Sequence, residues 1–399
     1  MTDEPTPTTP RSDQPSSPST PAPAPLFTPF EALPQSVSHT SRASSIVNPV
    51  PSQQLQHASG SVPANPDSAF NPANPADSTA IARGLAALDP LAVRPRISAR
   101  ILCIVFGALL IAAAFGVWWL GVRTETGQSY DEIVVTGLHN ALPGWLAAAL
   151  DPFIADNLLP APLNLTVVFS LLFGLAALIV MIVRKRWLLI GQAAAIAVLC
   201  YAATFLKELL PRPYLIDTAT PHANSAPSGH TILAATAVIL LLIAVSRVWR
   251  AACALIAAVF SSLIGLSVIV GSWHRPSDAV MSVLLVGGCT LLVLAVTARN
   301  GMDDPGTRVS SASIQIVGTI MITAGVLGCL YATYVIWQVL PGLALSAAWS
   351  ASGAYLSTIV GVAAVTSLTV GLVLAMRQLT AAPLSRIGLI GAPPAPPRD

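Results

Sequence analysis

Two histidines and an aspartate in the middle of the chain have the types and spacing of a phosphate-transfer site. His230 ends the stretch "APSGH", and His274 precedes Asp278 by four residues in "GSWHRPSDAV". If a helix begins at Pro276, His274 and Asp278 lie about one turn apart. An aspartate bound to one imidazole nitrogen fixes the tautomer and makes the other nitrogen a better nucleophile. We therefore predict His274 as nucleophile, Asp278 as its orienting group and His230 as the acid that protonates the leaving oxygen.

Residues suited to holding a phosphate lie close to these three in the sequence. Lys207 and Arg212, in "FLKELLPRPYL", are cations that suit phosphate oxygens. Ser228 and Gly229 begin a predicted helix, where free backbone N–H groups and the helix dipole attract anions. Glycine also lets a phosphate approach the backbone closely. Together these residues supply an anion site, an acid, a nucleophile and an orienting group, and the chemistry needs no metal or cofactor.

The composition indicates which elements must position these residues. Hydrophobic residues make up 54% of the 399, and charged residues only 10%, against about 25% in a typical soluble protein. The charges cluster and leave apolar runs of about twenty residues, each long enough to cross a hydrocarbon core about 30 Å thick. The alternation typical of membrane β-barrels is absent. The sequence therefore predicts an all-α, polytopic membrane helix bundle, and its net charge of +2 gives no indication of a nucleic-acid partner.

Eight apolar runs are predicted to span the membrane. Their approximate ranges are 99–121, 163–183, 187–206, 230–246, 251–271, 278–298, 312–338 and 354–376. Residues 133–158 are also apolar, but Pro143 and Gly144 interrupt them and acidic residues follow. We interpret this segment as a helix that lies in the membrane interface.

The basic residues predict the orientation of the spans, because cytoplasmic loops are enriched in Lys and Arg. The predicted cytoplasmic side carries Arg94, Arg96, Arg100, Arg184, Lys185, Arg186, Arg247, Arg250, Arg299, Arg308, Arg377 and Arg386. The outer side carries Arg123, Lys207, Arg212, Arg275, Asp131, Glu132, Asp151, Asp156 and the histidines His139, His222, His230 and His274. We therefore expect both termini in the cytoplasm and the candidate site at the outer face, in a protein of the cell membrane.

The ends of the chain suggest a division into four parts. Residues 1–95 contain 18 of the 34 prolines and cannot bury enough apolar surface to fold. We predict a disordered cytoplasmic tail over 1–95, a six-span core over 96–300, two further spans within 301–380 and a C-terminal tail over 381–399. The tail could bind a partner through its prolines, although a solvated tail is the simpler reading. The five cysteines lie in apolar runs, as small buried hydrophobic residues do.

Each candidate residue also has a simpler explanation. A histidine at a membrane interface can be a polar anchor, and PSGH can be a turn with an N-cap serine. Lys207 can extend to the lipid headgroups, and Asp278 can cap a helix. Their occurrence in this order at successive helix ends on one face favours the functional interpretation.

The arrangement resembles the type 2 phosphatidic acid phosphatase (PAP2) family, which is related to vanadium haloperoxidases. That family's pattern is K-x6-R-P, then P-S-G-H, then S-R-x5-H-x3-D, and the resemblance covers roughly residues 96–300. PSGH is intact at 227–230, and H-x3-D is present as His274 and Asp278. The resemblance implies a six-helix membrane core with the site at its outer face, and a phosphohistidine formed on His274. It also implies that Lys207, Ser228 and Gly229 hold the phosphate.

Two positions depart from the family pattern. Tyr214 stands where the first motif has arginine, and Arg212 comes two residues early. Val268 stands where the third motif has arginine. Loss of such a cation can remove a few kcal/mol of transition-state stabilisation. We expect Arg212, or Arg275 beside the nucleophile, to bind the phosphate instead.

Three hypotheses follow for the whole chain. The leading one is an integral membrane phosphatase that acts on lipid phosphate monoesters or diphosphates, such as phosphatidic acid, phosphatidylglycerol phosphate or polyprenyl diphosphates. Its partners would be the lipid substrate and the surrounding membrane lipids; the sequence does not indicate an oligomeric state. A second hypothesis is a degenerate family member that binds lipid phosphate without turnover. A transporter is the third, and it would need polar residues or broken helices within the spans, of which the sequence has few.

Overall fold

The computed structural model describes residues 97–155, 164–297, 312–345 and 347–381. The chain divides into two units, Met1–Ser68 and Ala69–Asp399, and all described residues belong to the second. The predicted N-terminal tail and residues 382–399 of the predicted C-terminal tail lie outside the described residues. So do Arg94, Arg96, Asp156, Arg299, Arg308 and Arg386.

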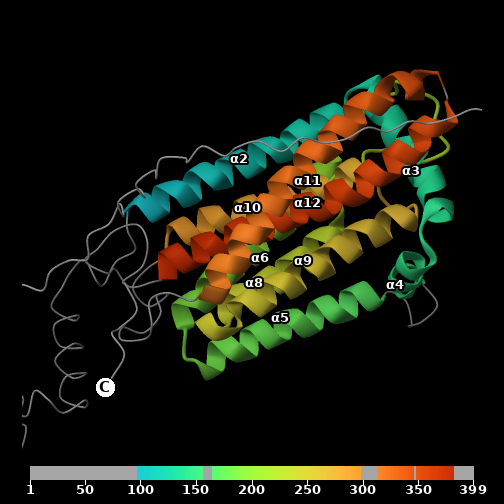
Figure 1. The fold of residues 1–399 in the computed structure, drawn as a ribbon. Coiled ribbons are helices and arrows are strands. Elements are labelled where there is room, and N and C mark those ends of the chain that lie inside the picture. Colours follow the sequence, from blue (N-terminus) through green and yellow to red (C-terminus); the bar gives the residue numbers. More distant parts are fainter. Residues whose placement is uncertain (1–96, 156–163, 298–311, 346, 382–399) are drawn as a thin grey trace, which may run out of the picture. The chain divides into compact units, whose positions relative to one another are not determined.

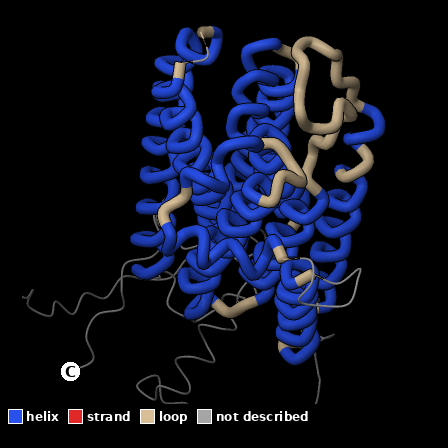
Figure 2. Tube along the Cα trace, turned by 90° about the vertical axis from the view of Figure 1, so that its right-hand side faces the viewer, coloured by secondary structure: helices blue, strands red, loops and turns tan. Residues whose placement is uncertain are grey.

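The described residues fold into helices joined by loops, without strands (Figure 2). In chain order, the helices are α2 (Ile97–Val122), α3 (Glu125–Ala141), α4 (Gly144–Ile154), α5 (Leu165–Val183), α6 (Trp187–Ala203), α7 (Leu206–Leu209), α8 (Gly229–Ala244), α9 (Arg247–Val270), α10 (Pro276–Ala295), α11 (Ala312–Ala344) and α12 (Ala348–Ala381). The prediction of an all-α membrane helix bundle is confirmed.

Seven helical segments are long and apolar enough to cross a membrane: α2, α5, α6 with α7, α9, α10, α11 and α12. The eighth expected span, α8, is apolar but has only 16 residues. At 1.5 Å per residue it extends about 24 Å, less than the hydrocarbon thickness. Most of α8 is buried against other helices, so its ends need not reach both membrane surfaces.

The apolar segment predicted to lie in the interface forms two helices, α3 and α4, with an angle of 111° between them. The bend falls at Leu142 and Pro143, as expected where proline interrupts a helix. Figure 1 shows both helices across one end of the bundle. Helix α3 begins at Glu125, earlier than expected, because the Thr124 side chain caps it by accepting a hydrogen bond from Gly127 N at 3.0 Å.

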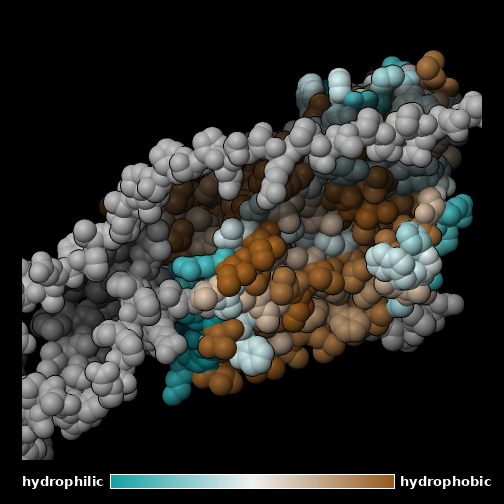
Figure 3. All heavy atoms as spheres, in the orientation of Figure 1, coloured by the Kyte–Doolittle hydropathy of each residue, from teal (hydrophilic) through white to brown (hydrophobic). Residues whose placement is uncertain are grey.

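Helices α9 and α10 lie inside the bundle, and the other candidate spans lie around them. In its most apolar stretch α10 is 83% buried and α9 67%, whereas α2 is 28% and α5 and α11 are each 22% buried. The outer helices expose large apolar side chains, and Figure 3 shows apolar residues along the helices with hydrophilic residues toward the ends. Such a distribution is expected of a helix bundle whose sides are surrounded by lipid.

The helices alternate in direction, so the bundle has two chemically different ends. We call the end with the starts of α5, α8 and α10 the site end, and the other the distal end. At the distal end Arg184 donates to the carbonyl of Ala244 (2.8 Å) and Arg100 to that of Thr297 (3.1 Å). Such cations complement the negative ends of helix dipoles. This end also includes Arg186, Arg247, Arg250 and Arg377.

Candidate active site

His274 and Asp278 meet where α9 turns into α10. Helix α9 ends with the carbonyl of Val268 accepting from both Trp273 N and His274 N, each at 3.0 Å. Ser272 takes a left-handed φ of 58°, which reverses the chain. Helix α10 then begins at Pro276, as predicted.

The Asp278 carboxylate holds the imidazole of His274. His274 Nδ1 lies 3.3 Å from Asp278 Oδ2, and the backbone N–H of Arg275 donates to the same oxygen at 3.0 Å. Asp278 is buried, whereas the His274 side chain keeps 16% of its surface exposed. With Nδ1 occupied by the carboxylate, Nε2 is the nitrogen left to react with a ligand.

Ser225 joins Asp278 to Arg275, and sequence reasoning did not select it. Its hydroxyl donates to Asp278 Oδ2 at 2.5 Å and accepts from Arg275 Nη1 at 2.7 Å. Arg275 Nη2 donates to Thr220 Oγ1 (2.9 Å) and to the Pro221 carbonyl (2.6 Å). The guanidinium therefore ties the loop before α8 to the dyad, and among the described residues only its Nε lacks a partner. A serine in a loop has no periodic signal that would have identified it.

The start of α8 presents an open backbone next to the dyad. Ser228 is fully buried; its hydroxyl caps the helix, accepting from Thr231 N at 3.4 Å. Its own N–H reaches the Asp278 carbonyl at 3.4 Å, which links the starts of α8 and α10. A Cβ at Gly229 would meet nothing within 4 Å. The space beside Gly229 can therefore admit an anion to the first amides of the helix, which have no carbonyl partner within the helix.

His230 is oriented by an asparagine that the sequence analysis missed. Asn164 caps α5 by accepting from Val167 N at 2.9 Å with its Oδ1, so its Nδ2 is the donor that lies 3.0 Å from His230 Nε2. In the neutral ring Nε2 is therefore the acceptor and Nδ1 holds the proton. The ring also lies 5.5 Å from that of Trp273, the neighbour of His274. An Asn directly before an apolar run is an N-cap signal, which could have marked Asn164.

The two predicted cations lie on the loop side of the site. Lys207 is exposed on α7, and its carbonyl accepts from Asn224 Nδ2 at 3.3 Å. Arg212 Nη1 donates to the carbonyls of Pro221 (3.4 Å) and His222 (3.3 Å). Its Nε and Nη2 are buried without a partner among the described residues. Burial, and then the charge of Arg275, lower the pKa of Arg212, so an anion between these guanidinium groups would relieve their repulsion.

Comparison with family models finds a match. Residues 185–302 match the model of the PAP2 superfamily. The chain carries a PAP2 superfamily domain. No curated protein and no solved structure matches the chain.

The PAP2 match includes all eight predicted site residues, from Lys207 to Asp278. The structure brings them to one end of the bundle, and their individual roles stay predictions. The predicted start of the core at residue 96 also stays a prediction. Among the described residues, no three His, Cys, Asp or Glu side chains gather as possible metal ligands.

Neither of the two residues that depart from the PAP2 motifs supplies a cation to the site. Tyr214 is 65% exposed, and its hydroxyl donates to Asp217 at 3.2 Å. Val268 is fully buried in α9. Arg275 reaches the dyad through Ser225, and Arg212 shares the Pro221 carbonyl with it. That they replace the missing arginines stays a prediction.

Helix α3 supports the candidate site from outside the matched range. Glu132 accepts from Ala219 N (2.8 Å) and from Thr220 through its N–H (3.2 Å) and its hydroxyl (2.6 Å). Gln128 donates to the Pro213 carbonyl at 2.8 Å, and Asp131 accepts from the hydroxyl of Ser277. These three α3 residues are spaced i, i+3 and i+4 and therefore share one helix face. That face holds both the loop and the first turn of α10.

Proposed function

We propose that this PAP2-domain protein is an integral membrane phosphatase that hydrolyses lipid phosphate monoesters or diphosphates through a phosphohistidine. The observation that carries the proposal is the His274–Asp278 pair at 3.3 Å, which leaves Nε2 to react at the end of the bundle where α8 begins. A nucleophile oriented by a buried carboxylate, next to an anion-binding helix start, is the arrangement that phosphoryl transfer requires.

The reaction balances with the groups at this end. His274 Nε2 attacks phosphorus, so that an N–P bond forms while the ester P–O bond breaks. His230 gives a proton to the departing oxygen and later takes one from water. The water oxygen then bonds to phosphorus, the N–P bond breaks, and phosphate leaves. Arg212, Arg275 and the amides near Gly229 hold the phosphate oxygens.

The position of the site favours a lipid substrate. The dyad stands where long apolar helices end, so a phosphate headgroup can bind in water while its tail remains in the bilayer. Phosphatidic acid, phosphatidylglycerol phosphate and polyprenyl diphosphates fit this description. The arginines at the distal end favour a cytoplasmic distal end, cytoplasmic termini and an outward site in the cell membrane.

The proposal is tested by phosphate release from a panel of these lipid phosphates in detergent micelles. We expect His274→Ala to lower the rate at least about 10³-fold, as expected when a nucleophile is removed. Wild type should also retain labelled phosphate on His274 after rapid trapping. His139→Ala is the matched control, because His139 is an exposed histidine at the same end outside the dyad. Full activity of His274→Ala would overturn the mechanism.

A second function, lipid-phosphate binding without turnover, is favoured by one observation. Neither Val268 nor Tyr214 provides the cation that the motif expects there. This function predicts that wild type binds the same lipids yet releases no phosphate and traps no labelled histidine. The same panel therefore separates the two functions.

A further inference from the structure

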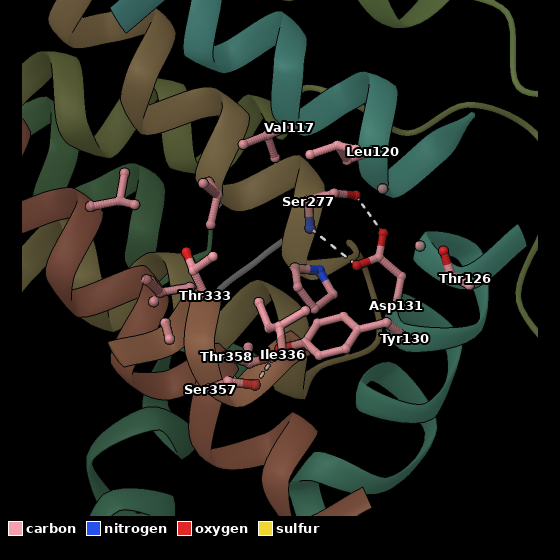
Figure 4. Close-up of a pocket in the computed structure, with 18 of the residues that line it drawn as sticks. Val117, Leu120, Thr126, Tyr130, Asp131, Ser277, Thr333, Ile336, Ser357 and Thr358 are labelled. Atoms are coloured by element: carbon pink, nitrogen blue, oxygen red, sulfur yellow. Dashed lines mark hydrogen bonds between the residues drawn. The ribbon is translucent and has the colours of Figure 1, made fainter. Parts of the chain in front are cut away.

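A cavity of about 440 Å³ lies between α2, α3, α10, α11 and α12 (Figure 4). We call it the rear cavity. Its wall is mainly apolar and includes Leu120, Val280, Ile336 and Val365, and Asp131 is one of its polar residues. Its volume falls within the range of about 300–1,000 Å³ that is usual for small-molecule sites.

The rear cavity is separate from the candidate active site. None of the eight predicted site residues lines it, although Pro276, Ser277 and Val280 of α10 do. Asp278 lies about 200° around the helix from Pro276, and its side chain contacts Ser225 on the other side. The first turn of α10 therefore stands between the dyad and the rear cavity.

The cavity has polar groups toward the site end. Figure 4 shows Asp131 pointing at Ser277, whose hydroxyl and N–H (3.4 Å) both donate to it. A carboxylate offers about four lone-pair positions, so Asp131 can accept from a further donor. Nearby, the Tyr130 hydroxyl lies 2.8 Å from both Ser357 Oγ and Thr358 Oγ1.

The outer surface of this region faces lipid. Leu327, Leu330 and Trp337 of α11 expose 61%, 62% and 66% of their surfaces, and α11 also provides cavity residues from Cys329 to Leu340. On the α11 side, a single helix therefore separates the cavity from hydrocarbon. An apolar cavity of this kind tends to stay dry and to take apolar ligands.

We propose that the rear cavity binds a membrane lipid alcohol, with its hydrocarbon chain between α10, α11 and α12 and its hydroxyl donating to Asp131. Apolar walls select the chain. Above the raised pKa of Asp131, which is about 7, the ionised carboxylate selects a donor rather than another acceptor. The alcohol released by the proposed hydrolysis belongs to the same chemical class, but the inference stands without that activity.

The experiment uses a long-chain alcohol that carries a diazirine in its chain. It is photolysed with the full-length protein in phosphatidylcholine vesicles at pH 8, above the pKa of about 7 at Asp131. We expect Ile336 and Val365, which line the cavity and are partly buried, to be labelled several-fold more than the lipid-facing Leu327 and Leu330. Gly361→Leu should reduce that labelling at least about five-fold. Gly361 lines the cavity, and a Cβ there would lie 3.6 Å from that of Ala332, another lining residue, so a leucine adds bulk at this wall. Equal labelling of cavity and lipid-facing residues, unchanged in Gly361→Leu, would overturn the proposal.

Matched variants keep the result interpretable. Gly174→Leu is the control, since Gly174 has open space around it on α5, away from the cavity. Ala332→Leu, from α11, is a second filling variant in case Gly361→Leu does not fold. The methyl ether of the probe should label the cavity less than the alcohol; equal labelling would overturn the role of Asp131. His274→Ala should label like wild type, so failure of the proposed phosphatase function leaves this test intact.

Discussion

The Asp278 carboxylate shows how the site is held at the level of single residues. Its Oδ2 accepts from Ser225, Arg275 N and His274 Nδ1, while its Oδ1 is buried without a partner among the described residues. Three donors on one oxygen hold the carboxylate in place. The orientation of His274 therefore depends on Ser225 as well as on Asp278.

Ser225→Ala tests this dependence. Loss of a hydrogen bond to a charged group costs about 1.5–3 kcal/mol, so we expect phosphate release to fall about 10- to 150-fold. The effect should appear mainly in kcat, because Ser225 acts through Asp278. Ser129→Ala on α3 is the control and should match wild type. An unchanged rate for Ser225→Ala would mean that the remaining donors suffice.

Helix α3 sets the position of both the loop and α10. One of its residues, Asp131, is a buried carboxyl group at the start of α10. Burial is the main cause that raises its pKa to about 7 from 3.8; the charge of Asp278 raises it further, whereas Ser277 and Arg275 lower it. The folded protein therefore binds a proton here that the unfolded chain has released.

Asp131→Asn should alter the pH dependence of stability. Between pH 4 and pH 7 the folded state holds more protons at Asp131, so wild-type stability falls as pH rises through this window. From pH 5 to pH 8 we expect wild type to lose about 2–3 kcal/mol more than Asp131→Asn. Thermal unfolding in detergent at the two pH values measures the difference.

The control for this prediction is a neutral residue on the same helix. Gln128 donates to the carbonyls of Val122 and Pro213, and its amide does not titrate. Gln128→Ala should lower the unfolding temperature by similar amounts at pH 5 and pH 8. Parallel pH profiles for wild type and Asp131→Asn would contradict the assignment.

At the scale of the whole described unit, the last two helices belong to the same packed body as the PAP2 domain. The hydroxyl of Tyr130 on α3 donates to the carbonyl of Ala354 (3.0 Å), and Arg250 on α9 donates to Gln378 (3.2 Å). Helices α11 and α12 approach closely at glycines, as small residues allow within membranes. A Cβ at Gly325 would lie 2.6 Å from the backbone N of Leu368.

Gly325→Ala should therefore force α11 away from α12. We expect a loss of about 1–3 kcal/mol, as for an overpacked core, read as a lower unfolding temperature. Gly318→Ala is the control, because its Cβ would make an ordinary 3.8 Å contact with Leu374. The unfolding temperature of Gly318→Ala should equal or exceed that of wild type, since alanine favours the helix. Equal stability of the two variants would show that the helices do not meet closely at Gly325.

Local sequence patterns were sufficient to predict the helices and the dyad. Apolar runs specify membrane helices because the bilayer requires about twenty such residues. The i, i+4 spacing of His274 and Asp278, with Pro276 between them, specifies a contact within one helical turn. Both depend on neighbours in the chain, so both could be read before the structure was known.

Packing between distant segments decided the rest. Ser277 and Asp131 are 146 residues apart, and His230 and Asn164 are 66 apart. No local period connects such pairs, since each contact exists only when several helices have come together. For the same reason the sequence did not reveal that Ser225 and Arg275 bind each other, or that α11 and α12 enclose the rear cavity.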